Sequence, residues 1–222
     1  INEVRGGVWE LVPRVTVRDE QEELRYAFAY QPTYERFFAL EDSSNAGDIS
    51  GFDHNANGRL TWFADPATSV LLDGSFTRER RVLQEYFGGG GGSPSGVDAT
   101  DGQYLQRGRA SARFQRALDR RLSVNGGYTY DNFDVSRRDR SDTESHSGSL
   151  GVNYALDEHT TVGATGTVRF RKTDALVNGT DFRSLTRTID LQFSLSREIT
   201  EHLDVVIAAG PSLFEVRDEQ ST

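Results

Sequence analysis

The sequence predicts an all-β protein: a transmembrane antiparallel up-and-down β-barrel that forms one domain over residues 1–222. Three observations support this fold class. Apolar and polar residues alternate with a period of two, tight turns alternate with longer polar connections, and no apolar run is long enough for a membrane helix. The longest such run, near residues 205–209, is far below the roughly 20 residues that a helix needs. Short turns at one end and longer loops at the other are typical of outer-membrane barrels.

The alternation defines the two faces of each strand. Residues 149–156, for example, read Ser-Leu-Gly-Val-Asn-Tyr-Ala-Leu, so one face is apolar and the other is polar or small. Aromatic residues stand near the ends of such segments, where the interfacial girdles of a barrel are expected. They are Trp62, Phe114, Tyr154 and Phe170.

A tight hairpin recurs four times. Residues 63–72, 114–124, 154–162 and 195–205 each read as the end of one strand, a turn of a few residues and the start of the next strand. These turns join neighbouring antiparallel strands. We expect all four at the periplasmic end of the barrel.

About ten strands follow from these signals, and most reach the ~9–11 residues of a tilted transmembrane strand. Pro32 and Pro211 interrupt the pattern and predict bulges or positions near a rim. The longer connections are expected at 38–55, 81–103, 135–145 and 173–182. Residues 81–103 include five consecutive glycines and predict a flexible external loop. The expected strands are near residues 9–17, 24–37, 56–64, 69–80, 104–116, 122–134, 146–156, 160–172, 183–196 and 203–216.

Strand direction predicts that these residues are part of a larger barrel. If the tight turns face the periplasm, the segment at 9–17 runs inward and the segment at 203–216 runs outward. Both chain ends then lie outside the cell, whereas complete barrels of this type normally start and finish in the periplasm. We therefore expect at least one further strand at each end, and twelve or more strands in total.

Composition limits the function. Only 36% of the residues are hydrophobic and the mean hydropathy is −0.58, which is low for a soluble core of this size but normal for a barrel with a polar lumen. A net charge of −9 argues against a nucleic-acid partner. The absence of cysteine excludes disulfides and thiolate metal sites, and we expect no cofactor.

Charged residues on the polar side of the alternation are candidates for a lumen. Rings of charge select ions or sugars in channels, but mixed charge also fits a closed, salt-bridged interior. The sequence leaves both readings open. The lumen-facing candidates are Arg109, Arg113, Arg169, Arg171, Asp73, Asp131, Asp190 and Glu35.

Basic residues recur at the outer strand ends. Lipopolysaccharide presents phosphate groups at that depth, and guanidinium groups bind phosphate in a bidentate manner. The alternative is ordinary solvated charge, balanced by neighbours such as Asp139 and Asp142. The lipopolysaccharide-binding candidates are Arg78, Arg80, Arg137, Arg138, Lys172 and Arg183.

Signals for metal binding and catalysis are weak. Residues 53–58 match the opening of a calcium loop, but Ala64 stands where the motif requires a bidentate Glu, so a polar loop that enters a strand is favoured over a metal site. Of the four histidines, two fall in expected turns, and His54 points to the opposite face from its neighbour Asp53. We expect no enzyme.

Three segments carry a family resemblance: residues 11–15 (Leu-Val-Pro-Arg-Val), 30–37 (Tyr-Gln-Pro-Thr-Tyr-Glu-Arg-Phe) and 53–55 (Asp-His-Asn). The chain resembles a porin-like group of Gram-negative outer-membrane β-barrel proteins that are often associated with exopolysaccharide and envelope export systems. The resemblance implies a missing first strand and no catalytic residues.

Three function classes follow. The first is a non-enzymatic outer-membrane barrel that serves as a pore or membrane component of an envelope export or assembly system. The second is a closed structural barrel that anchors a partner protein or a surface assembly. The third is a soluble all-β adhesin or sandwich, whose apolar face would be buried. The expected partners are outer-membrane lipid, lipopolysaccharide, and other envelope proteins or polysaccharide.

Overall fold

A computed structural model describes residues 6–39, 49–80, 104–135, 141–177, 180–200 and 203–221. Twelve antiparallel strands make up the regular structure of these ranges, and none of their residues is helical. None of them belongs to a helix long and apolar enough to cross a membrane. The strands are β1 (Gly6–Leu11), β2 (Val15–Glu20), β3 (Leu24–Ala39), β4 (Ile49–Asp65), β5 (Thr68–Arg80), β6 (Tyr104–Ala117), β7 (Leu122–Val135), β8 (Ser141–Ala155), β9 (Thr160–Val177), β10 (Thr180–Thr200), β11 (Leu203–Ala209) and β12 (Ser212–Ser221).

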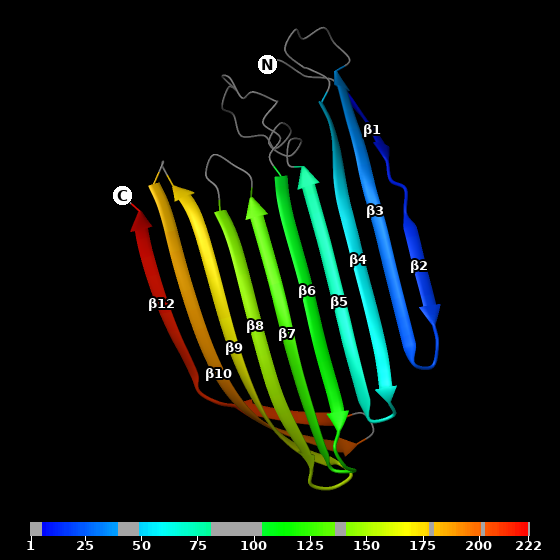
Figure 1. Cartoon of the computed structure of the whole chain (residues 1–222), viewed down its shortest axis with the longest axis vertical. Helices are drawn as coiled ribbons and strands as arrows, with labels where there is room; N and C mark the ends of the chain where they lie inside the picture. Colours follow the sequence, from blue (N-terminus) through cyan, green and yellow to red (C-terminus); the bar gives the residue numbers. More distant parts are fainter. Residues whose placement is uncertain are drawn as a thin grey trace.

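All strands belong to one up-and-down sheet in the order β1-β3-β4-β5-β6-β7-β8-β9-β10-β11 (Figure 1). β2 also pairs with β3, and β12 also pairs with β10. Twelve strands therefore occupy ten positions across the sheet, because each edge position is shared by two short strands. This confirms the all-β antiparallel fold. The expected strands near 9–17 and 203–216 are each divided into two short strands, β1 with β2 and β11 with β12.

Prolines explain the first break. Leu11 pairs with Tyr34 and Val15 pairs with Tyr30, so the register is unchanged across the gap and Pro13 falls opposite Pro32. Neither proline has an N–H group to donate. Pro32 itself makes no bulge, because it pairs with His54 in the unshifted β3–β4 ladder. The interruption expected at Pro32 lies instead in the facing strand, between β1 and β2.

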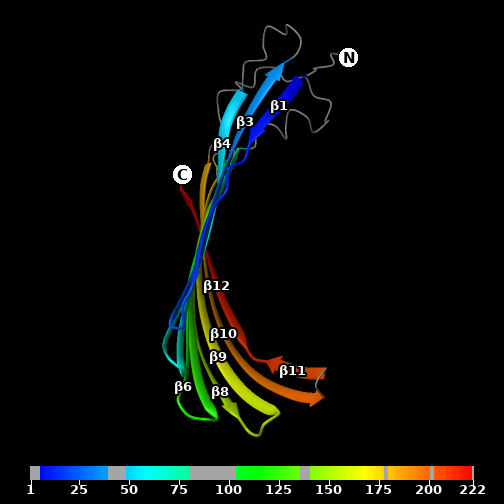
Figure 2. The same cartoon turned by 90° about the vertical axis from the view of Figure 1, so that its right-hand side faces the viewer.

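The second break, at Gly210 and Pro211, separates β11 from β12. Phe193 pairs with Ala209 and Asp190 pairs with Ser212, so both short strands follow β10 in one register. The backbone N–H of Leu191 donates to the carbonyl oxygen of Pro211 at 3.0 Å. Figure 2 shows that the sheet curves strongly toward the end where β11 lies. The interruption expected at Pro211 is thus present, without loss of register.

Three predicted tight turns are where the sequence places them, between β4 and β5, β6 and β7, and β8 and β9. An aspartate caps each of the three that are described. The backbone N–H of Ala67 donates to Asp65 at 2.7 Å, that of Arg121 to Asp119 at 2.7 Å, and that of His159 to Asp157 at 2.8 Å. These backbone N–H groups hold the pKa values of Asp119 and Asp157 below their usual range. The fourth turn, at residues 201–202, lies outside the described ranges.

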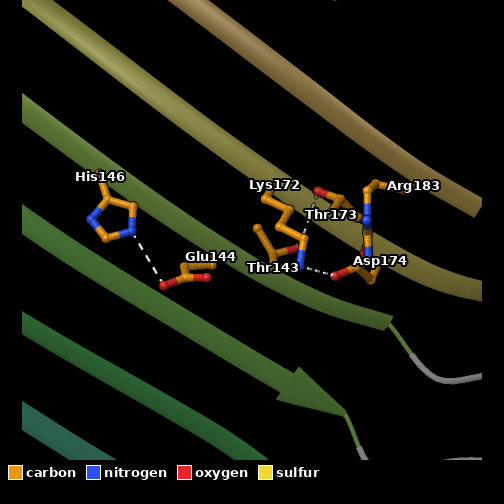
Figure 3. A network of polar contacts seen from close by, with 7 residues as sticks. All are labelled: Thr143, Glu144, His146, Lys172, Thr173, Asp174 and Arg183. Atoms are coloured by element: carbon orange, nitrogen blue, oxygen red, sulfur yellow. Dashed lines mark hydrogen bonds and ion pairs between the residues drawn. The ribbon is translucent and has the colours of Figure 1, made fainter. Parts of the chain in front are cut away.

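Strands extend further into the polar connections than expected. β4 begins at Ile49, inside the connection expected at 38–55. Val177 of β9 pairs with Thr180 of β10, so the long connection expected at 173–182 is wrong. Polar contacts replace apolar alternation there (Figure 3): Asp174 Oδ1 lies 2.8 Å from Arg183 Nε across the strand pair, and Asp174 Oδ2 lies 2.7 Å from Lys172 Nζ on the same strand. The expected external loop at 81–103 lies outside the described residues.

The calcium-like motif at residues 53–58 is part of strand β4. Its potential ligands Asp53, Asn55 and Asn57 lie on one face but are spread over about 13 Å of extended strand, so the three cannot converge on one ion. The expected entry loop is therefore strand from Ile49 onward.

Candidate functional site

Register gives the sheet one continuous apolar face, because residues directly opposed on neighbouring strands share a face. These side chains are exposed, as for Leu150 at 65% and Phe193 at 55%. Ala29 is the one buried hydrophobic residue in the described part of the chain, so no second layer covers this face within those ranges. One cross-strand row on it, from β3 to β10, consists of Leu24, Trp62, Val70, Phe114, Gly126, Leu150, Gly166 and Leu191.

The opposite face is polar and carries every lumen candidate. Hydroxyl and charged side chains dominate its rows, with small residues between them. The row from β3 to β10 nearest the middle of the sheet consists of Ala27, Arg59, Asp73, Ser111, Thr129, Ser147, Arg169 and Thr188. All eight lumen candidates named from the sequence lie on this polar face.

The aromatic edge of the apolar face beside the tight turns (its lower edge) shows that the strands are tilted relative to the barrel axis. The row of Trp62 on β4 reaches Leu150 on β8 after four strand steps, but the edge aromatic of β8 is Tyr154, four residues further on (154 − 150). The edge therefore shifts by one residue per strand. With about 3.3 Å per residue and about 4.8 Å between strands, the tilt is about 35°. Closed barrels need such a stagger and tilts of this size.

Aromatic and histidine side chains bound the apolar face at its outer edge. Phe52 on β4 lies ten residues from Trp62 (62 − 52), which at this tilt corresponds to a band about 27 Å high, near the ~25 Å of known barrels. Histidines at this edge are hydrogen-bonded: the Tyr30 hydroxyl lies 2.9 Å from His54 Nδ1, and the Tyr128 hydroxyl lies 2.6 Å from His146 Nδ1.

Basic residues lie on the apolar face just beyond this outer edge. Arg78 pairs with His54 in the β4–β5 ladder, and its guanidinium lies 4.0 Å from the centre of the Tyr104 ring. Lys172 lies two residues beyond Phe170 on β9. Arg183 belongs to the polar network of Figure 3. The lipopolysaccharide candidates Arg137 and Arg138, and the side chain of Arg80, lie outside what the structure describes.

A groove of about 390 Å³ joins part of this basic edge across β8, β9, β10 and β12. Arg187 and Arg217 line it with Lys172, beside the apolar Phe170 and Leu185. The Arg187 guanidinium lies 5.6 Å from the centre of the Phe170 ring. The groove thus combines apolar and cationic surface at one depth.

The polar face divides the lumen candidates into paired and unpaired charges. Arg113 lies 3.8 Å from Asp73, and Arg109 lies 3.6 Å from Asp131. The Asp190 carboxylate accepts a hydrogen bond from the Ser212 hydroxyl. Glu35 lies toward the long-connection end of β3, opposite Gly51.

Arg169 and Arg171 differ from these residues. Across the described part of the chain, no carboxylate lies within ion-pair distance of either guanidinium. They line a cleft of about 540 Å³ on the polar face together with Arg109 and Arg107. Arg107 was missed as a site residue, although it lies two residues from Arg109 and therefore on the same face.

Two solved structures show a distant likeness to the chain. No protein family matches the sequence, and no curated protein does. Among solved structures, the chain is similar to an outer membrane channel from Pseudomonas putida F1, with 16% identity, a TM-score of 0.41, and coverage of 97% of this chain and 84% of the channel. It is also similar to a mutant ferric enterobactin receptor from Pseudomonas aeruginosa, with 13% identity, a TM-score of 0.41, and coverage of 92% of this chain and 43% of the receptor.

Proposed function

We propose that the chain forms the wall of a non-enzymatic β-barrel in the outer membrane of a Gram-negative bacterium. One observation carries this proposal: a continuous exposed apolar face, about 27 Å high, ends at aromatic residues on both edges and covers one side of a tilted sheet. Lipid would contact this face, and the polar face would line the lumen. A soluble sandwich would require a second layer over the apolar face, and the described ranges contain none.

The lumen is more consistent with a pore than with a sealed scaffold. A sealed interior of low dielectric requires a partner for each charge, whereas Arg169 and Arg171 have no carboxylate at ion-pair distance among the described residues. We propose that the pore serves an envelope export or assembly system and that its cargo is a polysaccharide. A closed barrel that anchors a partner protein or surface assembly is the second candidate, favoured by the ion pairs of Arg109 and Arg113.

Conductance distinguishes the two candidates. The full-length protein, inserted into a planar bilayer, is expected to give steady single-channel currents that an acidic polysaccharide reduces, because the arginines of the polar face attract anionic chains. Insertion is verified separately by protection of the strands from protease. Silence from a verified, inserted barrel would contradict the pore and support the anchoring scaffold.

We further propose that the basic outer edge contacts lipopolysaccharide. Lys172, Arg187 and Arg217 line a groove beside apolar Phe170 and Leu185, an arrangement that suits a phosphorylated lipid headgroup with acyl chains beneath it. Acidic side chains share the groove, namely Glu144 and Glu215, so the groove is only moderately cationic.

Charge reversal tests this contact. The Lys172→Glu, Arg187→Glu double variant is expected to retain severalfold less lipopolysaccharide than the unmodified protein, measured as lipid phosphate per protein after detergent extraction. Arg197→Glu is the matched control, because Arg197 lies on the same strand and face as Arg187 but beside the tight turns, where the periplasmic leaflet would be. Equal lipid loss in both variants would count against the contact.

A further inference from the structure

We propose that the cleft between β6 and β9 on the polar face is a binding site for multivalent anions, with carboxylate or phosphate groups as the recognised chemistry. The inference rests on the proposed function in one respect, because it takes the polar face to line a lumen. The site consists of two arginine pairs, Arg107 with Arg109 on β6 and Arg169 with Arg171 on β9.

The register brings these pairs to opposite sides of one cleft. Arg109 is opposite Asp131, Asp131 is opposite Ser145, and Ser145 is opposite Arg171, so Arg109 and Arg171 occupy one cross-strand row. Three strand spacings separate their backbones, or about 14 Å. Arg107 and Arg109 line the cleft from β6, and Arg169 and Arg171 line it from β9.

Tilt places the two pairs at the same depth. The midpoint of the Arg107–Arg109 pair is residue 108, one residue from Arg109 toward the outer edge. The midpoint of the Arg169–Arg171 pair is residue 170, one residue from Arg171 toward the tight turns. Because the stagger is one residue per strand, the row is three residues nearer the outer edge at β9 than at β6. The midpoints therefore differ by one residue in depth, about 3 Å. A ligand that lies parallel to the membrane would meet both pairs.

The charges of the cleft are poorly compensated. Four arginines and one aspartate line it, a balance of +3 (4 − 1). Asp131 engages Arg109 at 3.6 Å, and Arg107 lies 5.4 Å from the centre of the Phe133 ring. In the described part of the chain, no carboxylate lies within ion-pair distance of Arg169 or Arg171. Cationic groups without a partner are available for an incoming anion.

Hydroxyl side chains line the cleft between the two arginine pairs. Thr129, Thr143, Ser145 and Ser147 supply them and offer both donors and acceptors. A monovalent anion would balance only one of the three excess positive charges of the cleft. An anion with several charged groups, or a chain of them, would engage both pairs. The geometry therefore favours multivalent over monovalent anions.

Calorimetry on the full-length protein in detergent tests the site without relying on conductance. Tripolyphosphate and citrate are the multivalent probes, and acetate is the monovalent one. We expect both multivalent probes to bind at least tenfold more tightly than acetate, with affinity that falls as salt rises. The Arg169→Gln, Arg171→Gln double variant is expected to lose at least tenfold in affinity for both. If tripolyphosphate alone meets these expectations, the recognised group is phosphate; if citrate alone does, it is carboxylate.

Matched controls keep the result interpretable. Arg113→Gln removes an arginine of the same face that is paired with Asp73 and lies outside the cleft, and its affinity is expected to stay within about twofold of the unmodified protein. Arg169→Lys, Arg171→Lys keeps the charge and the fold but removes bidentate geometry, and is expected to bind with intermediate affinity. Unchanged binding in the glutamine variant, or no preference for either multivalent probe over acetate, would overturn the site.

The outcome is separable from that of the pore. If the protein binds multivalent anions but gives no current in the bilayer, the anion site is supported and the proposed pore is contradicted. If it conducts but does not prefer multivalent anions, the pore is supported and the anion site is contradicted.

Discussion

Replacement of Leu150 by arginine is expected to destabilise the membrane-inserted protein by about 2–4 kcal/mol, the cost of a cationic side chain near the middle of the lipid-facing surface of a barrel. Leu150 is 65% exposed and lies on the apolar face between Gly126 and Gly166, well inside the aromatic edges. The free energy of unfolding would be measured by denaturant titration of the protein folded into phospholipid vesicles.

The adjacent residue supplies the control. Ser149→Arg introduces the same side chain one position away, on the polar face, where the arginine would reach the aqueous lumen. We expect less than about 1 kcal/mol of change, as is usual for surface substitutions. A soluble protein would tolerate arginine at the exposed position 150 at least as well as at 149. Equal effects of the two substitutions would therefore contradict the lipid-facing assignment.

Gly210→Ala is expected to disrupt the edge formed by β10, β11 and β12. A Cβ atom at position 210 would lie 1.7 Å from the backbone oxygen of Leu191 and 2.9 Å from the Cα atom of Gln192. Both obstacles are backbone atoms, so no side-chain rotation relieves the contact. The strands must separate, which breaks the hydrogen bond from Leu191 N–H to the Pro211 carbonyl and costs about 1–3 kcal/mol for the unpaired group in addition to strain.

Gly166→Ala is the matched control, because Gly166 pairs with Leu191 on the other side of β10 and nothing lies within 4 Å of a Cβ atom there. Unfolding in vesicles would measure stability, and hydrogen exchange of the Leu191 amide would locate the damage. We expect faster exchange of that amide only in Gly210→Ala. Unchanged exchange and stability in this variant would contradict the close approach of the two strands.

Most of the fold could be predicted from the sequence, because its signals are local. The period-two alternation around residues 149–156 identified both faces, and the aspartates at 65, 119 and 157 cap turns that were placed correctly. The errors lie where polar residues form strands. The segment 173–182 contains no apolar alternation, yet the β9–β10 ladder continues through it, and Asp174 contacts Arg183 across the two strands.

The candidate site could be predicted only in part. Alternation placed Arg109, Arg113, Arg169 and Arg171 on one face, but it gave no reason to separate Arg113 from the others. The structure pairs Arg113 with Asp73 and adds Arg107 to the cleft. Distances between side chains on different strands depend on register, which local patterns do not encode.

The sequence by itself determined which residues share a face and where the chain reverses, because side-chain direction in a strand and turn chemistry depend on a few neighbouring residues. Only the tertiary structure decided that Pro13 faces Pro32, that Arg109 and Arg171 share a row, and that the strands tilt by one residue per step. These features arise from register, in which many weak cross-strand pairs between distant segments are satisfied together.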